Sequence, residues 1–189
     1  YIGDITDLIK QYDSFSNYLV DIDLVCGGPP CQGFSMANRQ RLIDDPRNIL
    51  YKKYLLFLQK VKPRFFIMKN VKGMLNKIQE VIDDIKIILG SEYDVDFAVF
   101  NAKYFGVPQN RERLIVVGNR IGISSEILIS NLKRRQDENA FTLYDAIGDL
   151  PQLKPNRTKN RNQIENEDVG FLCVEYDYKK TPFYIHING

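Results

Sequence analysis

The sequence has few of the residues from which metal sites and disulfide frameworks are built. Its three cysteines, Cys26, Cys31 and Cys173, show neither metal-ligand spacing nor the pattern of a disulfide scaffold. His186 is the only histidine, so we expect no zinc site and no other bound metal. This cysteine usage fits a reducing compartment, and we expect a cytoplasmic protein.

Long apolar runs and a large charge of one sign are lacking as well. No apolar run reaches membrane-spanning length and no signal peptide opens the chain, so we expect no membrane partner. The formal net charge of +2 does not by itself indicate a nucleic-acid partner. A DNA-binding protein can still be nearly neutral if its lysines and arginines lie on one face. The 189 residues suit one domain, or one domain and part of a second.

Short apolar runs alternate with helical patterns along the first 120 residues. We predict strands over residues 23–26, 64–68, 93–100 and 114–117, and amphipathic helices over 47–61 and 78–89. Pro63 and Gly90 should end the two helices. Alternating strands and helices predict an α/β fold with right-handed crossovers and a mostly parallel sheet. The last two strands are close enough in sequence to pair antiparallel.

The alternation of short apolar runs with helical patterns weakens after about Asn119. Residues 142–150 predict a short helix, capped by Thr142 and ended by Pro151. Residues 155–168 are rich in Asn, Arg and Lys and predict an exposed loop. The start at Tyr1 and the end at Gly189 lead us to expect a piece of a larger enzyme.

Residues 28–35, Gly-Pro-Pro-Cys-Gln-Gly-Phe-Ser, place Cys31 in a rigid loop where a buried strand is predicted to end. Backbone N–H groups at a helix start lower the pKa of a thiol and favour the reactive thiolate. An isolated cysteine is more often a buried structural residue, and we interpret Cys26 within the strand in that way. The prolines and glycines around Cys31 favour a nucleophile instead.

Polar residues also lie at the end of the second predicted strand and just before the last one. Lys69 and Asn70 come at the end of the second strand, so their side chains should face the rim that carries the thiol loop. Arg111 and Arg113 precede the last strand and point to one side if that segment is extended. Two guanidiniums beside a thiol suit an anionic or carbonyl-bearing ligand. The alternatives are a solvated lysine and a surface run in which the arginines pair with Glu112.

Taken in order, several segments resemble the cytosine-5 DNA methyltransferase family: residues 3–5, 28–35, 45–48 with Leu50, 68–75, 105–113 and 145–151. Each segment alone is weak evidence for the family, whereas the order and spacing of all of them over about residues 1–151 make the resemblance specific. It implies a Rossmann-like class I methyltransferase sheet, incomplete in its N-terminal half, with an antiparallel last strand. Residues 1–151 would then be a partial catalytic domain, and 152–189 the start of a target-recognition region or a loop extension.

The resemblance implies transfer of a methyl group from S-adenosylmethionine to carbon 5 of a cytosine flipped out of double-stranded DNA. It gives Cys31 the role of adding to carbon 6, which makes carbon 5 nucleophilic. Arg113 and Arg111 would hold the carbonyl oxygen of the base. Two further sets of contacts follow by resemblance: Asp4, Ile5, Pro30 and Leu50 for the cofactor, and Gln32, Ser35 and Asn70 for the substrate.

Lys69 departs from the family, which carries a glutamate at this position. That glutamate engages ring nitrogen 3 and the exocyclic amine of cytosine. A carboxylic acid can donate to the nitrogen and accept from the amine, whereas an ammonium can only donate. Lys69 can still favour the Cys31 thiolate by its charge, but we predict strongly impaired methyl transfer.

The second departure is that the family's opening strand, its cofactor loop and its closing motifs do not occur in this sequence. We therefore expect an open sheet edge near residues 23–26. Exposed apolar edges tend to find partners, so a complementary methyltransferase segment or chain is an expected partner.

Several interpretations remain open at this stage. The leading one is an enzyme fragment from a bacterial restriction–modification system, associated with the nucleoid. RNA is not excluded as substrate, because one branch that resembles this family methylates transfer RNA. A catalytically inactive DNA-binding or regulatory subunit is the second class, in which Lys69 marks a retired active site. An unrelated α/β thiol protein is the least favoured, given the ordered set of motifs.

Overall fold

The structure is a computed structural model of the chain, and it describes residues 3–30, 49–149, 164–166 and 170–172. The chain divides into two compact units, which are described separately. The first contains residues 1–101 and 111–136, and the second contains residues 102–110 and 137–189.

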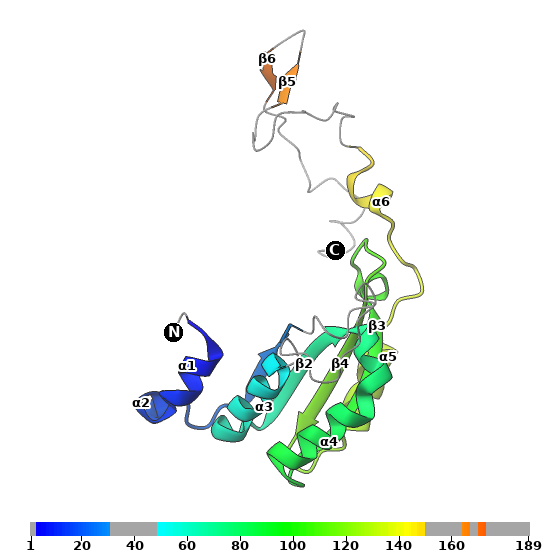
Figure 1. Cartoon of the computed structure of the whole chain (residues 1–189). Coiled ribbons are helices and arrows are strands. Elements are labelled where there is room, and N and C mark those ends of the chain that lie inside the picture. Colours follow the sequence, from blue (N-terminus) through cyan, green and yellow to red (C-terminus); the bar gives the residue numbers. More distant parts are fainter. Residues whose placement is uncertain (1–2, 31–48, 150–163, 167–169, 173–189) are drawn as a thin grey trace. The chain divides into compact units, whose positions relative to one another are not determined.

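A four-stranded mixed sheet forms the centre of the first unit, in the order β1-β2-β4-β3 (Figure 1). Its strands are β1 (Leu24–Gly27), β2 (Phe65–Val71), β3 (Asp94–Asn101) and β4 (Glu112–Asn119). β1 and β2 run parallel, whereas β4 lies antiparallel to both β2 and β3. The predicted α/β fold is thus confirmed, as is the antiparallel pairing of the last two strands.

Helices cover both faces of this sheet (Figure 1). Helices α3 (Ile49–Val61) and α4 (Ile78–Leu89) bury one face, and α5 (Ser125–Arg134) packs on β3 and β4 from the other. Apolar residues three or four positions apart form the buried stripes of α3 and α4, as expected for helices that lie on a sheet. The larger core comprises Tyr51, Tyr54, Leu55, Leu58, Phe66, Met68, Met74, Val81, Ile85, Leu89, Tyr93, Leu114 and Val116.

Short helices complete the first unit. They are α1 (Ile5–Lys10), α2 (Tyr12–Phe15), η1 (Ser16–Tyr18) and η4 (Lys72–Lys77). Helix α1 contacts α3, which brings the beginning of the described chain beside the first covering helix. Within the described residues, no helix has the length and apolar character needed to span a membrane.

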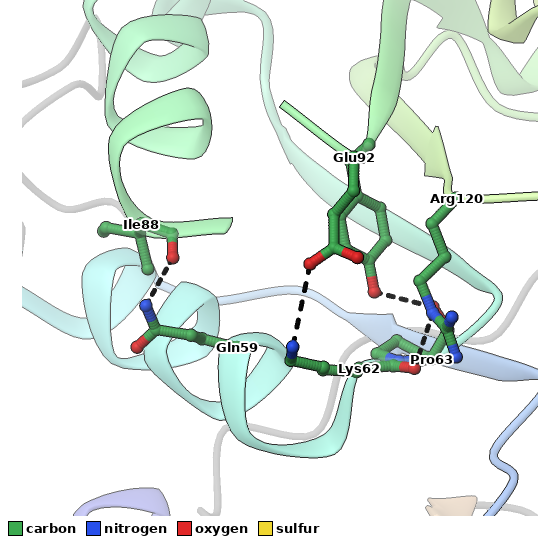
Figure 2. Close-up of polar contacts among 7 residues, drawn as sticks. Gln59, Lys62, Pro63, Ile88, Glu92 and Arg120 are labelled. Atoms are coloured by element: carbon green, nitrogen blue, oxygen red, sulfur yellow. Dashed lines mark hydrogen bonds and ion pairs between the residues drawn. The ribbon is translucent and has the colours of Figure 1, made fainter. Parts of the chain in front are cut away.

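The turn between α3 and β2 is held by contacts from the same end of the sheet, where β3 begins and β4 ends (Figure 2). Lys62 adopts a positive φ of 48°, and Pro63 then prevents the helix from continuing. Arg120 Nε donates to the carbonyl oxygens of Lys62 at 2.9 Å and Pro63 at 3.2 Å. The hydroxyl of Tyr93 donates to the same Pro63 oxygen at 2.6 Å, and Lys62 pairs with Glu92. These contacts fix where β2 enters the sheet, and they confirm Pro63 as the end of the helix.

Element boundaries follow the sequence pattern where packing is local. Helix α4 has the predicted bounds, and Gly90 ends it with φ 83°, a backbone conformation that favours glycine. Strands β2 and β4 are longer than predicted, because Val71 pairs across with Arg113 and extends the ladder. Lys69 and Arg113 are therefore strand residues rather than loop residues.

Helix α5 was missed by the sequence pattern, and so were α1 and α2. The start of α5 is anchored on β3, where Ser125 N–H donates to Asp94 Oδ2 at 2.5 Å and the Ser125 hydroxyl donates to the Asp94 carbonyl at 2.7 Å. Ile129 is buried on Ala98 and Val117. This helix is stabilised by tertiary contacts that local periodicity does not report.

The second unit contains η5 (Ala102–Phe105), α6 (Leu143–Ile147) and a hairpin of β5 (Ile164–Asn166) with β6 (Gly170–Leu172). The predicted cap of α6 is confirmed: Thr142 Oγ1 accepts from Asp145 N–H, and the Asp145 carboxylate accepts from Thr142 N–H. The latter bond lowers the pKa of the Asp145 carboxyl. The loop prediction for residues 155–168 is wrong at residues 164–166, where cross-strand pairing overrides the polar composition.

Candidate functional site

A pocket of about 330 Å³ lies where β1 ends, between that strand, α1 and α3. This volume falls within the range of small-molecule sites. Three residues predicted to contact the cofactor, Ile5, Pro30 and Leu50, line it together. The remaining wall is mainly apolar and is formed by Val25, Cys26, Gly27, Gly28, Pro29, Tyr54 and Phe57. Residues from three separate segments thus meet at one cavity at the carboxyl end of a strand.

Asp4, the fourth predicted cofactor residue, caps α1 beside this pocket. Its Oδ1 accepts a 2.6 Å hydrogen bond from Thr6 N–H, and that bond lowers the pKa of the Asp4 carboxyl. An ionised carboxylate at an N-cap satisfies a backbone donor that would otherwise lack a partner. Asp4 therefore supports the helix that presents Ile5 to the pocket, and its contact with a cofactor stays a prediction.

Tyr54 joins the two parallel strands from beneath the pocket. Its hydroxyl lies 3.1 Å from the Val25 carbonyl oxygen and 3.0 Å from the Ile67 carbonyl oxygen, so it can donate to either strand. Burial raises the pKa of the Tyr54 hydroxyl well above its usual value, and the electrostatic effect of the nearby Cys26 adds to the rise. The phenol consequently remains a proton donor, and its ring forms a fixed part of the pocket wall.

Cys26 is exposed and has a free thiol, so its interpretation as a buried structural cysteine is wrong. The reason lies in the position of β1, which pairs only with β2 among the described strands. An edge strand leaves part of its surface uncovered. Cys26 therefore contributes to the pocket wall rather than to the core.

We expect Gly27→Ala to damage this pocket more than Gly28→Ala does. A Cβ on Gly27 would lie 2.3 Å from the Tyr54 ring, whereas one on Gly28 would meet nothing nearer than 3.7 Å. Gly27→Ala should lower the free energy of unfolding by about 1–3 kcal/mol, because the ring has to move. A comparable loss in binding free energy would lower the affinity for S-adenosylmethionine by about tenfold or more. Urea unfolding and calorimetric titration measure both quantities, and equal effects of the two variants would contradict the packing argument.

Asn70 fixes the start of the segment that carries the predicted nucleophile. It is 3% exposed, and its Nδ2 donates to the Pro29 carbonyl oxygen at 3.1 Å. Its Oδ1 accepts from Val71 N–H at 2.8 Å, so both ends of the amide are engaged by protein groups. Asn70 thereby ties β2 to the proline segment that follows β1. Its predicted contact with substrate is not tested by this geometry.

Lys69 lies on the opposite face of β2 from Asn70 and is exposed. A Cβ placed on Gly28 would lie 3.7 Å from Lys69 Nζ, so the ammonium reaches the first residue of the 28–35 segment. Lys69 is paired in register with Ile115 of β4. The structure thus places the lysine at the same rim as the pocket, as the sequence predicted.

The two arginines lie at the beginning of β4, and Glu112 between them pairs elsewhere. Lys72 Nζ contacts both oxygens of the Glu112 carboxylate, at 2.8 Å and 2.9 Å. Arg113 Nη1 donates to the Glu112 backbone carbonyl, while Arg113 Nε is buried without a hydrogen-bond partner among the described residues. Arg111 is exposed, and its backbone N–H donates to Asn101 Oδ1. The alternative in which the arginines pair with the Glu112 carboxylate is therefore wrong.

Three predicted site residues, Cys31, Gln32 and Ser35, lie outside the described residues. The structure does describe the two residues before Cys31: the Pro29 carbonyl accepts from Asn70, and Pro29 and Pro30 line the pocket. The anchoring role of Asn70 was not foreseen, since its partner is 41 positions away and no local pattern reports it.

Comparison with known proteins gives the same assignment as the motifs. The sequence profile of the family described as C-5 cytosine-specific DNA methylase matches residues 1–172. The chain is 38% identical to the Type II methyltransferase M.AquIA of Picosynechococcus sp., over 81% of this chain and 71% of that protein. It is 35% identical to the Type II methyltransferase M.NgoPII of Neisseria gonorrhoeae, over 88% of this chain but only 49% of the relative.

A solved structure has the same fold. It is described as a DNA modification methyltransferase encoded within a prophage, from E. coli, and it matches 94% of this chain and 49% of its own with a TM-score of 0.63 and 25% identity. The chain thus spans about half the length of several proteins that it matches. The match of the family profile over most of the sequence, together with these relatives, shows that the chain belongs to the C-5 cytosine-specific DNA methylase family.

Proposed function

We propose that the chain transfers a methyl group to carbon 5 of cytosine in double-stranded DNA, with Cys31 as the nucleophile. The observation that carries this proposal is the pocket at the end of β1, which joins Ile5, Pro30 and Leu50. Gly28 belongs both to this pocket and to the surroundings of the Lys69 ammonium. Cofactor and base would therefore meet at the segment that contains Cys31.

The methyl donor of this family is S-adenosylmethionine, which supplies an electrophilic methyl group on a sulfonium centre. The pocket fits part of such a molecule. Its apolar wall, with Leu50 and Phe57, suits a flat heterocycle such as adenine. No charged side chain lines it, so the amino and carboxylate groups of the donor would bind beyond the described wall.

On the base side, the Cys31 thiolate would form a bond to carbon 6 of a flipped-out cytosine. This addition breaks the carbon 5–carbon 6 double bond and makes carbon 5 nucleophilic. Carbon 5 then gains the methyl group and loses its proton, and the thiolate leaves as the double bond re-forms. Arg113 and Arg111 would hold the carbonyl oxygen at position 2 and stabilise charge that develops during attack.

Lys69 sets the efficiency of this reaction in our proposal. Its ammonium has three donors and no acceptor, so it cannot pair with the exocyclic amine of cytosine. We therefore propose that methyl transfer to cytosine is strongly impaired. The same residue favours a second candidate function, a DNA-binding or regulatory subunit of a methyltransferase that does not turn over.

We further propose that a complementary methyltransferase segment or chain completes the sheet at β1. Leu24 on this strand is 48% exposed, and β1 pairs only with β2 among the described strands. Next to it an apolar groove of about 400 Å³ lies between the sheet and α5, lined by Leu24, Phe65, Ile67, Val117, Leu128, Asn131, Leu132 and Arg135. Strands that pair in parallel normally have both faces covered.

The domain assignment belongs to the same proposal. Residues 1–151 would supply the catalytic part, and residues 152–189 would begin a target-recognition region. Several relatives are Type II methyltransferases of bacteria, which supports a role in a bacterial restriction–modification system.

Two measurements on the 189-residue chain test the proposal. The first is calorimetric titration with S-adenosylmethionine, for which we expect saturable binding. The second is transfer of tritiated methyl groups to duplex DNA of mixed sequence, which should be slow but measurable, and absent from Cys31→Ala. Equal incorporation by wild type and Cys31→Ala would overturn the role of Cys31.

A fluorinated cytosine separates the two candidate functions. DNA with 5-fluorocytosine traps an enzyme whose cysteine has attacked, because fluorine cannot leave as a proton does. A covalent complex that is lost in Cys31→Ala supports the enzyme. Reversible DNA binding without a covalent complex and without tritium transfer supports the subunit instead.

A further inference from the structure

The chain leaves β1 through a segment that cannot continue the sheet. The ladder between β1 and β2 ends at the pair formed by Gly27 and Met68. Pro29 and Pro30 follow, and proline has no backbone N–H with which to extend such a ladder. The proline rings also fix φ and make the segment stiff, so a single contact can hold both residues in place.

Asn70 supplies the bond that the ladder cannot. It lies on β2 two residues beyond Met68, and its Nδ2 donates to the Pro29 carbonyl oxygen at 3.1 Å. Val71 N–H donates to Asn70 Oδ1 at 2.8 Å. A backbone N–H can only donate, so this bond fixes the orientation of the amide and turns its NH2 group toward Pro29. The Asn70 side chain thus continues the pairing of β1 with β2 past the end of the strand.

The surroundings of Asn70 suit a support rather than a contact with a ligand. The residue is 3% exposed and lies on the face of β2 that carries Phe66 and Met68 into the core. Lys69 points to the other face of the strand. A buried amide whose oxygen and nitrogen both bond to backbone groups has little surface left for a base or a cofactor. The effect of Asn70 on the reaction would therefore pass through Pro29.

Pro29 connects the cofactor pocket with the predicted nucleophile. Pro29 and Pro30 line the pocket beside Leu50, and Cys31 follows Pro30 directly in the sequence. A shift of Pro29 would move the wall against which the methyl donor binds and also the point from which the Cys31 segment begins. Reacting groups that are misplaced by about 1 Å can lose about 100-fold in rate.

We propose that Asn70 is a positioning residue, which holds the Pro29–Pro30 segment for the cofactor and for the Cys31 nucleophile at once. The inference rests on the proposed methyl transfer and deepens it. Asn70 acts through Pro29 and does not itself touch the substrate. One hydrogen bond would then support both halves of the reaction, binding of the methyl donor and attack on the base.

Two substitutions remove this bond. Asn70→Ala deletes the amide and leaves the Pro29 carbonyl without its donor. Asn70→Leu also removes the donor but fills most of the space of the amide, so it carries the comparison if the smaller side chain prevents folding.

Asn119 offers a matched control on the same sheet. It is fully buried at the end of β4, where its Nδ2 donates to the Ile123 carbonyl oxygen at 2.6 Å and its Oδ1 accepts from Ile123 N–H at 3.2 Å. It pairs in register with Phe65, at the opposite end of β2 from Asn70. Asn119→Ala therefore removes a buried amide with similar backbone bonds and leaves the proline segment untouched.

The experiment measures three quantities in wild type and in the three variants. Urea unfolding gives stability, calorimetric titration gives the affinity for S-adenosylmethionine, and single-turnover capture of DNA with 5-fluorocytosine, at saturating S-adenosylmethionine, gives the rate of covalent attack. We expect both Asn70 variants to lose about tenfold in affinity and about 100-fold in the rate of capture. Asn119→Ala should lose stability but should bind and react as wild type does.

The possible results separate the inference from the proposed function. Asn70 variants that bind and react as well as Asn119→Ala overturn the inference, while methyl transfer stands. A loss confined to affinity or to capture alone contradicts the shared role of the bond. Wild type that forms no covalent complex overturns the proposed methyl transfer, and the inference falls with it.

Discussion

Lys69→Glu is expected to raise methyl transfer to cytosine by about 100-fold or more. The lysine already occupies the required place, since it lies on β2 with its ammonium beside Gly28. A glutamic acid there can donate to ring nitrogen 3 and accept from the exocyclic amine. Proton transfer by a positioned side chain is commonly worth two to four orders of magnitude, so the gain should exceed the error of a tritium assay many times.

Two controls separate hydrogen bonding from charge. Lys69→Gln removes the charge and restores an acceptor but has no acidic proton, so we expect it to recover only a small part of the activity. Lys86→Glu makes the same change in net charge on an exposed position of α4, away from the rim, and should leave transfer unchanged. Wild-type turnover at ordinary enzyme rates, or a Lys69→Glu variant no faster than Lys69→Gln, would contradict the prediction.

Helices and strands could be predicted where residues that are close in the sequence determine which side chains are buried. Helix α4 is the clearest case, because its apolar period and Gly90 report the buried stripe and its end. Helix α5 was missed although Glu126 stands in its first turn and Lys133 and Arg134 in its last. Its apolar residues fall mostly in the run 127–129, so the period is weak, and the contact with β3 decides its structure.

Long-range pairing could not be predicted in the same way. The insertion of β4 between β2 and β3 depends on the whole sheet, and the extension of both strands follows from the pairing of Val71 with Arg113. The Asn70–Pro29 bond likewise joins positions that no local pattern relates. Motif order identified the family and the pocket residues, whereas packing decided which side chains are engaged by protein and which are left for a ligand.

The packing of Phe66 over Gly118, between β2 and β4, should contribute strongly to stability. Phe66 is fully buried and is paired in register with Gly118, where a Cβ would lie 2.1 Å from its ring. Glycine is therefore required opposite Phe66 because the ring covers the neighbouring backbone. Phe66→Ala should lower the free energy of unfolding by about 3–5 kcal/mol, a large part of the stability of an ordinary domain.

A double-mutant cycle tests whether this pair is the cause. Gly118→Ala alone should cost about 1–3 kcal/mol, because the added methyl group displaces the Phe66 ring. In the Phe66→Ala background the ring is gone, so the same methyl group should cost little, and the two effects should fall short of additivity by about 1–3 kcal/mol. Ile87→Ala, at a side chain that is 79% exposed, is the control and should change stability by less than about 0.5 kcal/mol. Additive losses in urea unfolding would show that ring and glycine act separately, and the packing of Phe66 over Gly118 would then not explain the losses.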